Sequence, residues 1–398
     1  MQKHKGSVLL RKYFCGKETT AMKRILLIVL TILLLTTLCA CQDGKQEAQA
    51  AQMEALQAKI AKLEKSADRA EAENEKLQKE LAEAQEQVES LQQEISVLTR
   101  LKPGGEVYVL GKKVTAMTDG EDMYVDAALL PEAEFDRESC REQEEGRFVQ
   151  VEAACEALGM RYGTALDGLP YLALEKHPTL PQDGHAVPVL MYHAVSNDCW
   201  GEADLFVMPE ELDAQLNYLT QEGYDPIWFE DLSHLEDYDK PVLLTFDDGY
   251  DDNYTELLPL VQKYGVKVTV FVIGKDMNGM QHKMTAEQVR QMAETGLVSI
   301  QSHTYTHHDL SAMGEEETRM ELEYSRDAIA AVTGEVPYVL CYPEGRHSAL
   351  TVQLAKDYYT YGICMTGDLY HTGDDPFEVS RYYISRYTDL GSFANICK

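Results

Sequence analysis

The chain has 398 residues, 44% of them hydrophobic, and a formal net charge of −31 that results from 36 basic and 67 acidic residues. This length is enough for two or three globular domains, and the apolar share is ordinary for such domains. A surface this acidic repels nucleic acid and anionic lipid headgroups, so we expect no nucleic-acid partner, whereas a cationic polymer would be tolerated or attracted. Such acidity also helps to keep an exported protein soluble.

Residues 1–41 carry the pattern of an export signal. A basic pair at 23–24 precedes an apolar stretch at 25–38, which is short for a membrane span. The stretch ends in Leu-Cys-Ala-Cys at 38–41, which resembles a bacterial lipobox. The resemblance implies cleavage before Cys41 and a lipid on its sulfur, which would anchor the chain at the extracellular face of the bacterial membrane. The alternative is an uncleaved anchor helix.

Residues 42–102 are predicted to form a coiled-coil stalk. Between 53 and 98 there is no proline or glycine, and core-facing positions recur at steps of three and four. These positions are Met53, Leu56, Ile60, Leu63, Ala67, Ala70, Asn74, Leu77, Leu81, Ala84, Val88, Leu91, Ile95 and Leu98. β-Branched residues and one asparagine at a, with leucine at d, favour a parallel homodimer through residues 53–98. The alternatives are a lone charged helix and a hairpin, for which no turn signal exists.

Residues 105–177 are predicted to form a small α+β domain. Pro103-Gly104-Gly105 is expected to break the preceding helix, and short strand patterns surround one helix that ends near Gly159. The pattern resembles the small stalk domains of exported proteins of Gram-positive bacteria, which implies a spacer or wall-contacting role. A linker rich in proline follows at 177–188.

Residues 187–398 alternate between strand and helix patterns. Helices are expected at 253–265, from a capping box at Thr285 to Gly296, and at 314–334. Apolar strand patterns occur at 240–246, 266–274, 297–304 and 338–343. Repeated βα units predict an α/β domain with a parallel sheet, either open or closed into a barrel.

Polar residues follow three of these strands. The first strand is followed by Asp247 and Asp248, His303 and His307 lie at and after the end of the third, and the fourth is followed by Glu344 and Gly345. In a parallel α/β barrel the carboxyl ends of the strands share one rim, so we expect these residues to lie together.

This set of residues is typical of a catalytic metal site. Zn²⁺ and similar ions accept Asp oxygen and His nitrogen together, and three protein ligands leave a position at which water becomes acidic. A second aspartate beside the ligand, itself unbound, can take the proton of the water. The adjacent pair would therefore supply one ligand and one base. The alternative is a simple Asp-Asp-Gly turn with surface histidines.

The segments TFDDGY, SHTYTHHDL and CYPEG resemble the first three motifs of the polysaccharide deacetylases, the NodB-homology group known as carbohydrate esterase family 4. The resemblance covers roughly residues 187–395. It implies a distorted (β/α) barrel with fewer than eight repeats and a divalent metal, usually zinc. The metal would be bound by Asp248, His303 and His307, and Asp247 would be the general base.

The segment PVLMYHAVS at 188–196 resembles the front of a permuted branch that includes the poly-N-acetylglucosamine deacetylases. In that branch this segment supplies the catalytic histidine, which implies that His193 is the general acid. The alternative is a core histidine on a buried strand. Arg381, in SRYYI, matches a family arginine near the final strand and would replace the arginine that is missing from the third motif.

The third motif, Cys341-Tyr342-Pro343-Glu344-Gly345, departs from the family patterns Arg-Pro-Pro-Tyr-Gly and Ala-Tyr-Pro-Tyr-Gly. In the family, the backbone N–H of the tyrosine helps to hold the oxyanion. Here the corresponding donor would be the backbone of Glu344. An extra carboxylate near the metal would change the local charge and the fit of the substrate.

Six cysteines follow the signal segment: Cys140, Cys155, Cys199, Cys341, Cys364 and Cys397. Export would permit disulfide bonds between them, and their spacings match no metal-binding pattern. The sequence does not decide their pairing.

Together, the residues and the resemblance predict a metal-dependent enzyme that removes acetyl groups from an N-acetylglucosamine polymer at the cell envelope. The polymer could be poly-N-acetylglucosamine, peptidoglycan or a chitin-type chain. The alternatives are a catalytically degenerate carbohydrate-binding lipoprotein and a scaffold whose coiled coil docks to envelope partners. Candidate polymer contacts are the loop aromatics Tyr250, Tyr305, Tyr342 and Trp228.

Overall fold

The computed structural model describes residues 46–98, 100–182 and 184–398. The predicted export signal and the lipobox at 1–41 lie outside these ranges. The chain divides into two compact units, and the boundary lies between Val97 and Leu98. In the described ranges, no helix combines the length and apolarity that crossing a bilayer requires.

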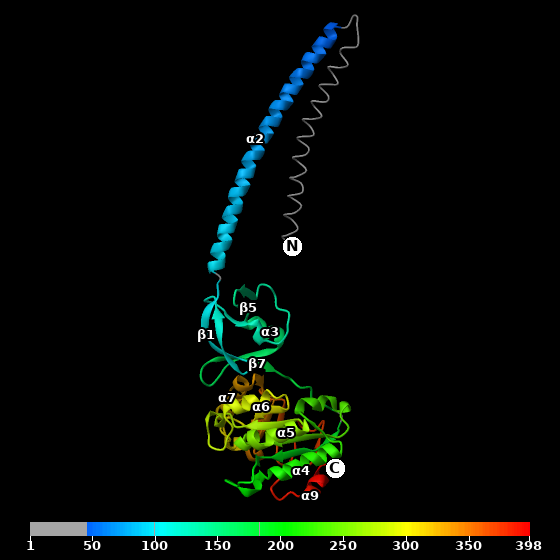
Figure 1. Ribbon diagram of the computed structural model, residues 1–398. Coiled ribbons are helices and arrows are strands. Elements are labelled where there is room, and N and C mark those ends of the chain that lie inside the picture. The colour runs from blue at the N-terminus through cyan, green and yellow to red at the C-terminus, as the bar shows by residue number, and fades with distance from the viewer. Residues whose placement is uncertain (1–45, 99, 183) are drawn as a thin grey trace. The chain divides into compact units, whose positions relative to one another are not determined.

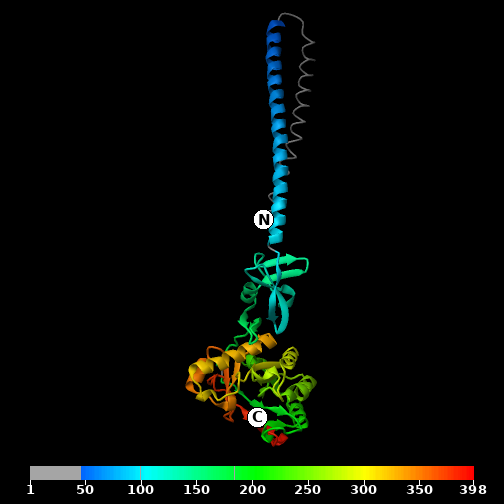
Figure 2. The ribbon, with the colours of Figure 1, turned by 90° about the vertical axis from the view of Figure 1, so that its left-hand side faces the viewer.

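The described part of the first unit is a long helix, α2, which spans Gln46–Leu98 and so ends one residue beyond the boundary (Figures 1 and 2). Its 53 residues correspond to a length of about 80 Å. Large apolar side chains at the predicted seam are exposed on this single helix: Leu56, Leu63, Leu77, Leu81, Val88 and Leu91. A second copy of the helix would cover them, and the parallel homodimer stays a prediction.

The small domain is built on an antiparallel hairpin and its neighbours. Its elements are β1 (Lys102–Val109), β2 (Lys112–Thr118), β3 (Met123–Asp126), β4 (Cys140–Gln143), β5 (Gly146–Gln150), α3 (Val151–Leu158), β6 (Met160–Thr164) and β7 (Pro170–Glu175). Helix α3 ends at Gly159, where the sequence predicted its end, and the φ of 61° makes Gly159 a left-handed cap. Pro103 does not end the long helix, which already stops at Leu98. Instead it lies in β1, at a bulge that precedes Glu106.

The small domain shares its sheet with the large domain. Strand β16 (Glu335–Val336) pairs in parallel with β7, so the sheet order is β16-β7-β1-β2-β3-β5-β4, with β6 beside β7. The buried Tyr171 of β7 donates a hydrogen bond from its hydroxyl to Asp327 Oδ1 at 2.6 Å. Asp327 lies on α7 (Glu315–Thr333) of the large domain. The two domains are therefore joined by backbone and side-chain hydrogen bonds.

The large domain has a curled parallel sheet in the order β18-β17-β15-β14-β13-β9-β20, which confirms the predicted α/β barrel class. The strands are β9 (Val189–Tyr192), β13 (Pro241–Phe246), β14 (Val268–Val272), β15 (Val298–Ser302), β17 (Val339–Cys341), β18 (Tyr361–Ile363) and β20 (Tyr382–Tyr383), and β12 (Asp225–Ile227) pairs with β13. The helices are α4 (Pro209–Gln221), α5 (Leu258–Tyr264), α6 (Ala286–Ala293), α7, α8 (Ala349–Ala355) and α9 (Leu390–Ile396) (Figure 1). Short pairs join β8 (Ala186–Val187) to β19 (Tyr370–His371) and β10 (Ala194–Val195) to β11 (Phe206–Val207).

The two faces of the sheet bury different sets of side chains, because successive residues of a strand point to opposite faces. In β13, Val242, Leu244 and Phe246 pack in a core with the surrounding helices. Leu243 belongs to a second core together with Phe271, Val339 and Cys341. Burial on both faces explains why these strands read as continuous apolar runs.

One C-terminal segment bridges the two edges of the curled sheet. Val379 pairs with Ile363 at the end of β18, and three residues later Tyr382 pairs with Leu190 of β9. Arg381 lies between these two contacts, and its side chain is fully buried. This segment therefore places the positively charged guanidinium of Arg381 in the interior of the barrel.

Candidate active site

The adjacent aspartates follow β13 and point in different directions. The backbone N–H of Asp247 donates to Tyr192 O at 2.9 Å, so Asp247 continues the strand pairing with β9. Asp248 has a φ of 74° and Gly249 a φ of 63°, which turn the chain sharply at this point. A Cβ at Gly249 would lie 3.0 Å from Val272 Cγ1, so the turn also needs the absence of a side chain.

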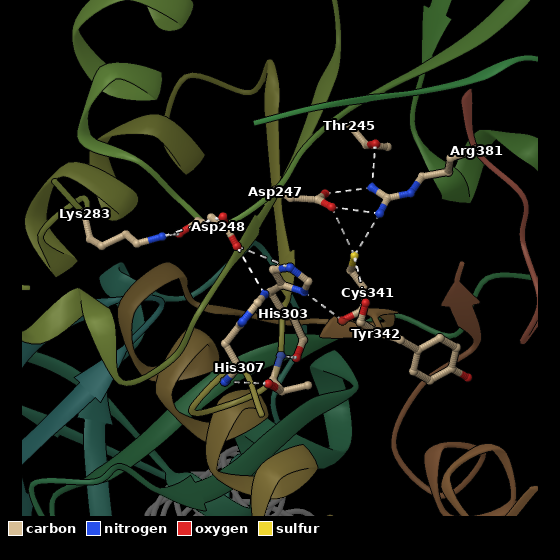
Figure 3. A network of polar contacts seen from close by, with 11 residues as sticks. Thr245, Asp247, Asp248, Lys283, His303, His307, Cys341, Tyr342 and Arg381 are labelled. Atoms are coloured by element: carbon tan, nitrogen blue, oxygen red, sulfur yellow. Dashed lines mark hydrogen bonds and ion pairs between the residues drawn. The ribbon is translucent and has the colours of Figure 1, made fainter. Parts of the chain in front are cut away.

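Asp248, His303 and His307 converge on one point (Figure 3). Asp248 Oδ1 lies 3.5 Å from His303 Nε2 and 3.4 Å from His307 Nε2. Two ligand atoms about 2.1 Å from a tetrahedral ion are about 3.4 Å apart, so the spacing fits a divalent cation held by these three residues.

The protonation state of His303 also fits a cation. Its Nδ1 lies 2.8 Å from the carbonyl oxygen of Cys341, to which Nδ1–H can donate. Burial lowers the pKa of His303 to about 4, so the ring is neutral and its Nε2 is an acceptor that faces the carboxylate oxygen of Asp248. Two acceptors that face each other repel unless a cation lies between them.

Arg381 binds Asp247 through both oxygens. Nη1 lies 2.7 Å from Oδ1 and Nη2 lies 2.7 Å from Oδ2, and both side chains are buried. The guanidinium also donates to Thr245 Oγ1 and to the carbonyl oxygen of Cys364. Burial alone would raise the pKa of Asp247, but the Arg381 charge outweighs it and holds the pKa well below its usual range. Arg381 thus contacts the predicted base directly.

Cys341 is a part of this cluster that sequence reasoning did not assign to the site. Its Sγ lies 3.5 Å from Asp247 Oδ2 and 3.2 Å from Arg381 Nη2. Cys341, Asp247 and His303 form a second group of potential ligand atoms. Burial raises the pKa of the Cys341 thiol, and Arg381 already occupies both oxygens of Asp247, so this group does not fit a metal. All six cysteines of the described ranges are unpaired.

His193 follows β9, and its ring is largely enclosed. The backbone oxygen of His193 accepts a hydrogen bond from Asn253 Nδ2 at 3.0 Å, and Tyr383 contacts the ring edge-on with centroids 5.8 Å apart. Burial lowers the pKa of His193, and the carboxylates of Asp247 and Asp248 oppose part of this shift. Its Nδ1 is buried without a hydrogen-bond partner in the described part of the chain. Such an orphan is typical of a functional group that acts on a ligand or water.

Glu344 has its carboxylate at the surface. The backbone is left-handed, with a φ of 54°, and the side chain is 61% exposed. The carboxylate lies 3.1 Å from Arg346 Nη1, which in turn contacts Asp309. Much of the extra negative charge of the third motif is therefore offset by Arg346.

Lys283 is a second residue that the sequence did not indicate. Its Nζ donates to the backbone oxygen of Asp248 at 3.0 Å and lies 4.0 Å from Oδ2 of the same residue (Figure 3). The segment around it is hydrogen-bonded to the aspartate turn, because Met284 N–H donates to Gly249 O at 2.9 Å. No local motif marks this lysine, because only the fold brings it to Asp248.

The comparison with known proteins agrees with this geometry. Residues 235–362 match the family model described as polysaccharide deacetylase. This range includes Asp247, Asp248, His303 and His307, whereas His193 and Arg381 lie outside it. The chain is 34% identical over 183 residues to YxkH of Bacillus subtilis, itself assigned to the polysaccharide deacetylases, and the match covers 44% of this chain and 63% of that protein.

Two further relatives extend the comparison. The poly-beta-1,6-N-acetyl-D-glucosamine N-deacetylase of Escherichia coli is 25% identical over 138 residues, which are 30% of this chain and 20% of that protein. The structure of the Streptococcus pyogenes deacetylase PplD in complex with acetate is similar with a TM-score of 0.51 and 26% identity, over 54% of this chain and 100% of that chain. The chain thus spans less than two thirds of the length of either relative compared by sequence. The large domain of this chain is therefore similar to the polysaccharide deacetylases, and residues 235–362 match the model of that family.

Proposed function

We propose that this protein is a metal-dependent hydrolase that removes N-acetyl groups from an N-acetylglucosamine polysaccharide at the cell envelope. The observation that carries the proposal is the convergence of Asp248, His303 and His307 at metal-ligand spacing, beside an aspartate that Arg381 keeps ionised. When bound, the divalent cation would polarise the acetyl carbonyl and make a water molecule acidic enough to react near neutral pH.

In this proposal Asp247 accepts the proton of the attacking water. A carboxylate has about four lone-pair positions. Arg381 uses one on each oxygen, and the Cys341 thiol uses the second one on Oδ2. One position on Oδ1 is left for a proton from substrate water. The low pKa of Asp247 keeps this oxygen unprotonated, and the buried Arg381 guanidinium holds the carboxylate in a fixed orientation.

His193 is the proposed proton donor to the departing amine. Hydrolysis of the acetamide breaks the C–N bond and yields acetate and an amine, so the nitrogen must gain a proton as it leaves. Because burial lowers the pKa of His193, its ring gives up a proton readily when it is protonated. The hydrogen bond from Asn253 to the backbone of His193 holds this segment in place.

The backbone of Glu344 is proposed to help hold the oxyanion. Its left-handed conformation follows Pro343, which lacks an N–H, so Glu344 is the first residue of this turn that can donate. A backbone donor does not depend on the side chain. This agrees with a carboxylate that lies at the surface beside Arg346.

The substrate class is proposed from the relatives. The name of the Escherichia coli protein states that it acts on poly-beta-1,6-N-acetyl-D-glucosamine. Removal of acetyl groups converts a neutral amide into an ammonium group, so the product is cationic. A chain with a net charge of −31 would attract such a polymer. Peptidoglycan and chitin-type chains share the same N-acetylglucosamine unit.

The N-terminal part is proposed to place this activity outside the cell. A lipid on Cys41 would anchor the chain to the membrane, and a parallel dimer of α2 would form the stalk. The exposed seam of α2, for example Leu63 and Leu91, supports a second copy of the helix as its partner.

The test is acetate release by the full chain, purified in detergent with zinc supplied, from β-linked N-acetylglucosamine oligomers and peptidoglycan fragments. Asp247→Asn should lower turnover by at least about 100-fold because it removes the general base, while metal content stays unchanged. Full activity of this variant would refute the assignment of the base. Binding of oligomers by the wild type without acetate release would favour a carbohydrate-binding lipoprotein instead.

A further inference from the structure

Two of the aromatic residues that the sequence suggested as polymer contacts are used within the fold. Trp228 donates from Nε1 to Val268 O at 2.9 Å, and Lys267 Nζ lies 4.9 Å from the centroid of its ring. Tyr342 is fully buried and donates its hydroxyl to Phe377 O. Trp228 and Tyr342 therefore have roles within the fold that disfavour stacking on a sugar ring.

Trp200 is an exposed aromatic residue that the core does not explain. Its indole stacks on the imidazole of His282, with centroids 4.1 Å apart and an angle of 7° between the planes. Tyr250 and Phe206 both make edge-type contacts with the indole, with ring centroids 4.9 and 4.8 Å away and interplanar angles of 67° and 87°. The neighbours thus fix the orientation of the indole, and 38% of the residue is still exposed to solvent.

This stacked pair is connected directly to the metal aspartate. Lys283 follows His282 and lies with its Nζ 3.8 Å from the centroid of the Tyr250 ring, while it donates to the backbone oxygen of Asp248. The backbone oxygen of His282 accepts from the N–H of Asp251 at 3.2 Å. The Lys283 side chain and the backbone hydrogen bond from Asp251 to His282 therefore link the stack to the turn that carries Asp248.

The loop that carries Trp200 also contacts the segment beside His193, the proposed general acid. Cys199 precedes Trp200 in the chain, and its Sγ lies 2.9 Å from Arg386 Nη1. Nη2 of the same arginine donates to the backbone oxygen of Asn197. Three residues before Arg386, Tyr383 contacts the ring of His193 and is itself 38% exposed. Exposed aromatic groups thus flank both the metal aspartate and the histidine.

His282 also has an unusual backbone. Its φ is 59°, a left-handed conformation that a residue other than glycine adopts at a cost. The backbone bond from Asp251 and the stack with Trp200 hold it there. Strain that the surroundings maintain at the edge of a site is a sign that the position of the side chain matters for function.

We propose that Trp200, His282 and Tyr383, which we call the aromatic wall, bind a pyranose ring next to the unit that is deacetylated. The C–H face of a pyranose packs on the face of an aromatic ring, and a rigid aromatic side chain loses little conformational entropy when it binds. The wall would make the enzyme act on chains of several N-acetylglucosamine units in preference to the monosaccharide. This inference rests on the proposed function and names the part of the substrate that is recognised.

Kinetics with substrates of different length test the wall. In Trp200→Ala, the ratio of kcat/KM for a β-linked N-acetylglucosamine tetramer to that for the monosaccharide should fall about tenfold, and Trp200→Phe should restore most of it. Tyr162→Ala, which removes an exposed aromatic group from β6 of the small domain, should leave the ratio unchanged. A ratio in Trp200→Ala equal to that of the wild type would overturn the proposal.

Binding without turnover gives a second readout. The chain has only two tryptophans, so the fluorescence of Asp247→Asn reports on Trp200 and Trp228 alone. Addition of the tetramer should change this fluorescence to saturation, and the change should be lost in Asp247→Asn/Trp200→Phe. A change that persists without Trp200, or no change at all, would refute the wall. Saturable Trp200-dependent binding without acetate release by the wild type would refute only the proposed hydrolysis.

Discussion

Replacement of Arg381 by methionine should expose how much of the site depends on one buried charge pair. Arg381 and Asp247 are joined by two contacts of 2.7 Å, and neither side chain has appreciable solvent exposure. Methionine has a similar length and no charge, so Arg381→Met leaves the Asp247 carboxylate buried and unpaired. Removal of one partner of a buried ion pair costs about 3–5 kcal/mol of stability.

The slope of the free energy of unfolding against pH should also change sign in Arg381→Met. In the wild type the pKa of Asp247 is below its unfolded value of about 3.9, so the pair contributes stability above that pH, and this contribution is lost as the pH falls through the folded pKa. In Arg381→Met the burial of Asp247 is opposed only by the weaker effects of His303 and His193, so we expect the pKa of the carboxyl to rise above the unfolded value. The native state then binds a proton more tightly than the unfolded chain, and the stability of this variant should fall as the pH rises from about 4 to 7.

Urea unfolding of the full chain, without metal and followed by tryptophan fluorescence, measures this effect, because Trp200 and Trp228 both lie in the large domain. The matched control is the double variant Asp247→Asn/Arg381→Met, which removes the buried charge together with its partner. It should recover at least about 2 kcal/mol relative to Arg381→Met alone. If Arg381→Met costs the same free energy in the wild type and in the Asp247→Asn background, the stability does not come from the charge pair.

Three further predictions concern the metal, a buried carboxyl and the stalk. Asp248→Ala should lower the Zn²⁺ affinity at least about 100-fold because one of three ligands is lost, whereas Asp247→Asn should keep the wild-type affinity, as measured by titration calorimetry. Burial raises the pKa of Asp252 to about 6, so protonation stabilises the native state. Between pH 7.5 and 4.5, the wild type should therefore gain about 2 kcal/mol of stability relative to Asp252→Asn, and equal pH profiles in urea unfolding would contradict this. Light scattering should show a dimer of the wild type and a monomer of Leu77→Glu/Leu91→Glu, because both changes place charge in the seam; a monomeric wild type would exclude the stalk dimer.

The alternation of strands and helices in the large domain could be predicted because local signals mark each element. The helix that begins after Thr285 has the predicted capping box, and α5 and α7 end at Gly265 and Gly334 as expected. The strand that leads to Asp247 was visible as a continuous apolar run, since both of its faces are buried. In contrast, β20 has only two residues and no apolar run of its own. Its place depends on pairing with β9, which lies almost two hundred residues earlier in the chain.

The candidate site divides in the same way. Asp248, His303 and His307 could be placed together because each follows a predicted strand, and parallel strands end at one rim. Cys341 was part of a recognised motif, but its contact with Asp247 depends on which face of β17 it occupies. Lys283 lies in a loop without any motif, and its contact with Asp248 arises from the backbone pairing of two loops. Such contacts are properties of the assembled barrel, so no local pattern indicates them.

The position of Arg381 connects barrel closure with the environment of Asp247, the proposed general base. The segment that carries it pairs with β18 through Val379 and with β9 through Tyr382, so the guanidinium reaches Asp247 only when both edges are joined. The proposed metal ligands follow β13 and β15, which pair with β14 independently of that closure. A chain with an open C-terminal edge would therefore keep the cation site and lose the group that keeps the base ionised and oriented. In this architecture, pairing of the last strand and the contact of Arg381 with the proposed base are thus one event, whereas assembly of the proposed metal site is a separate one.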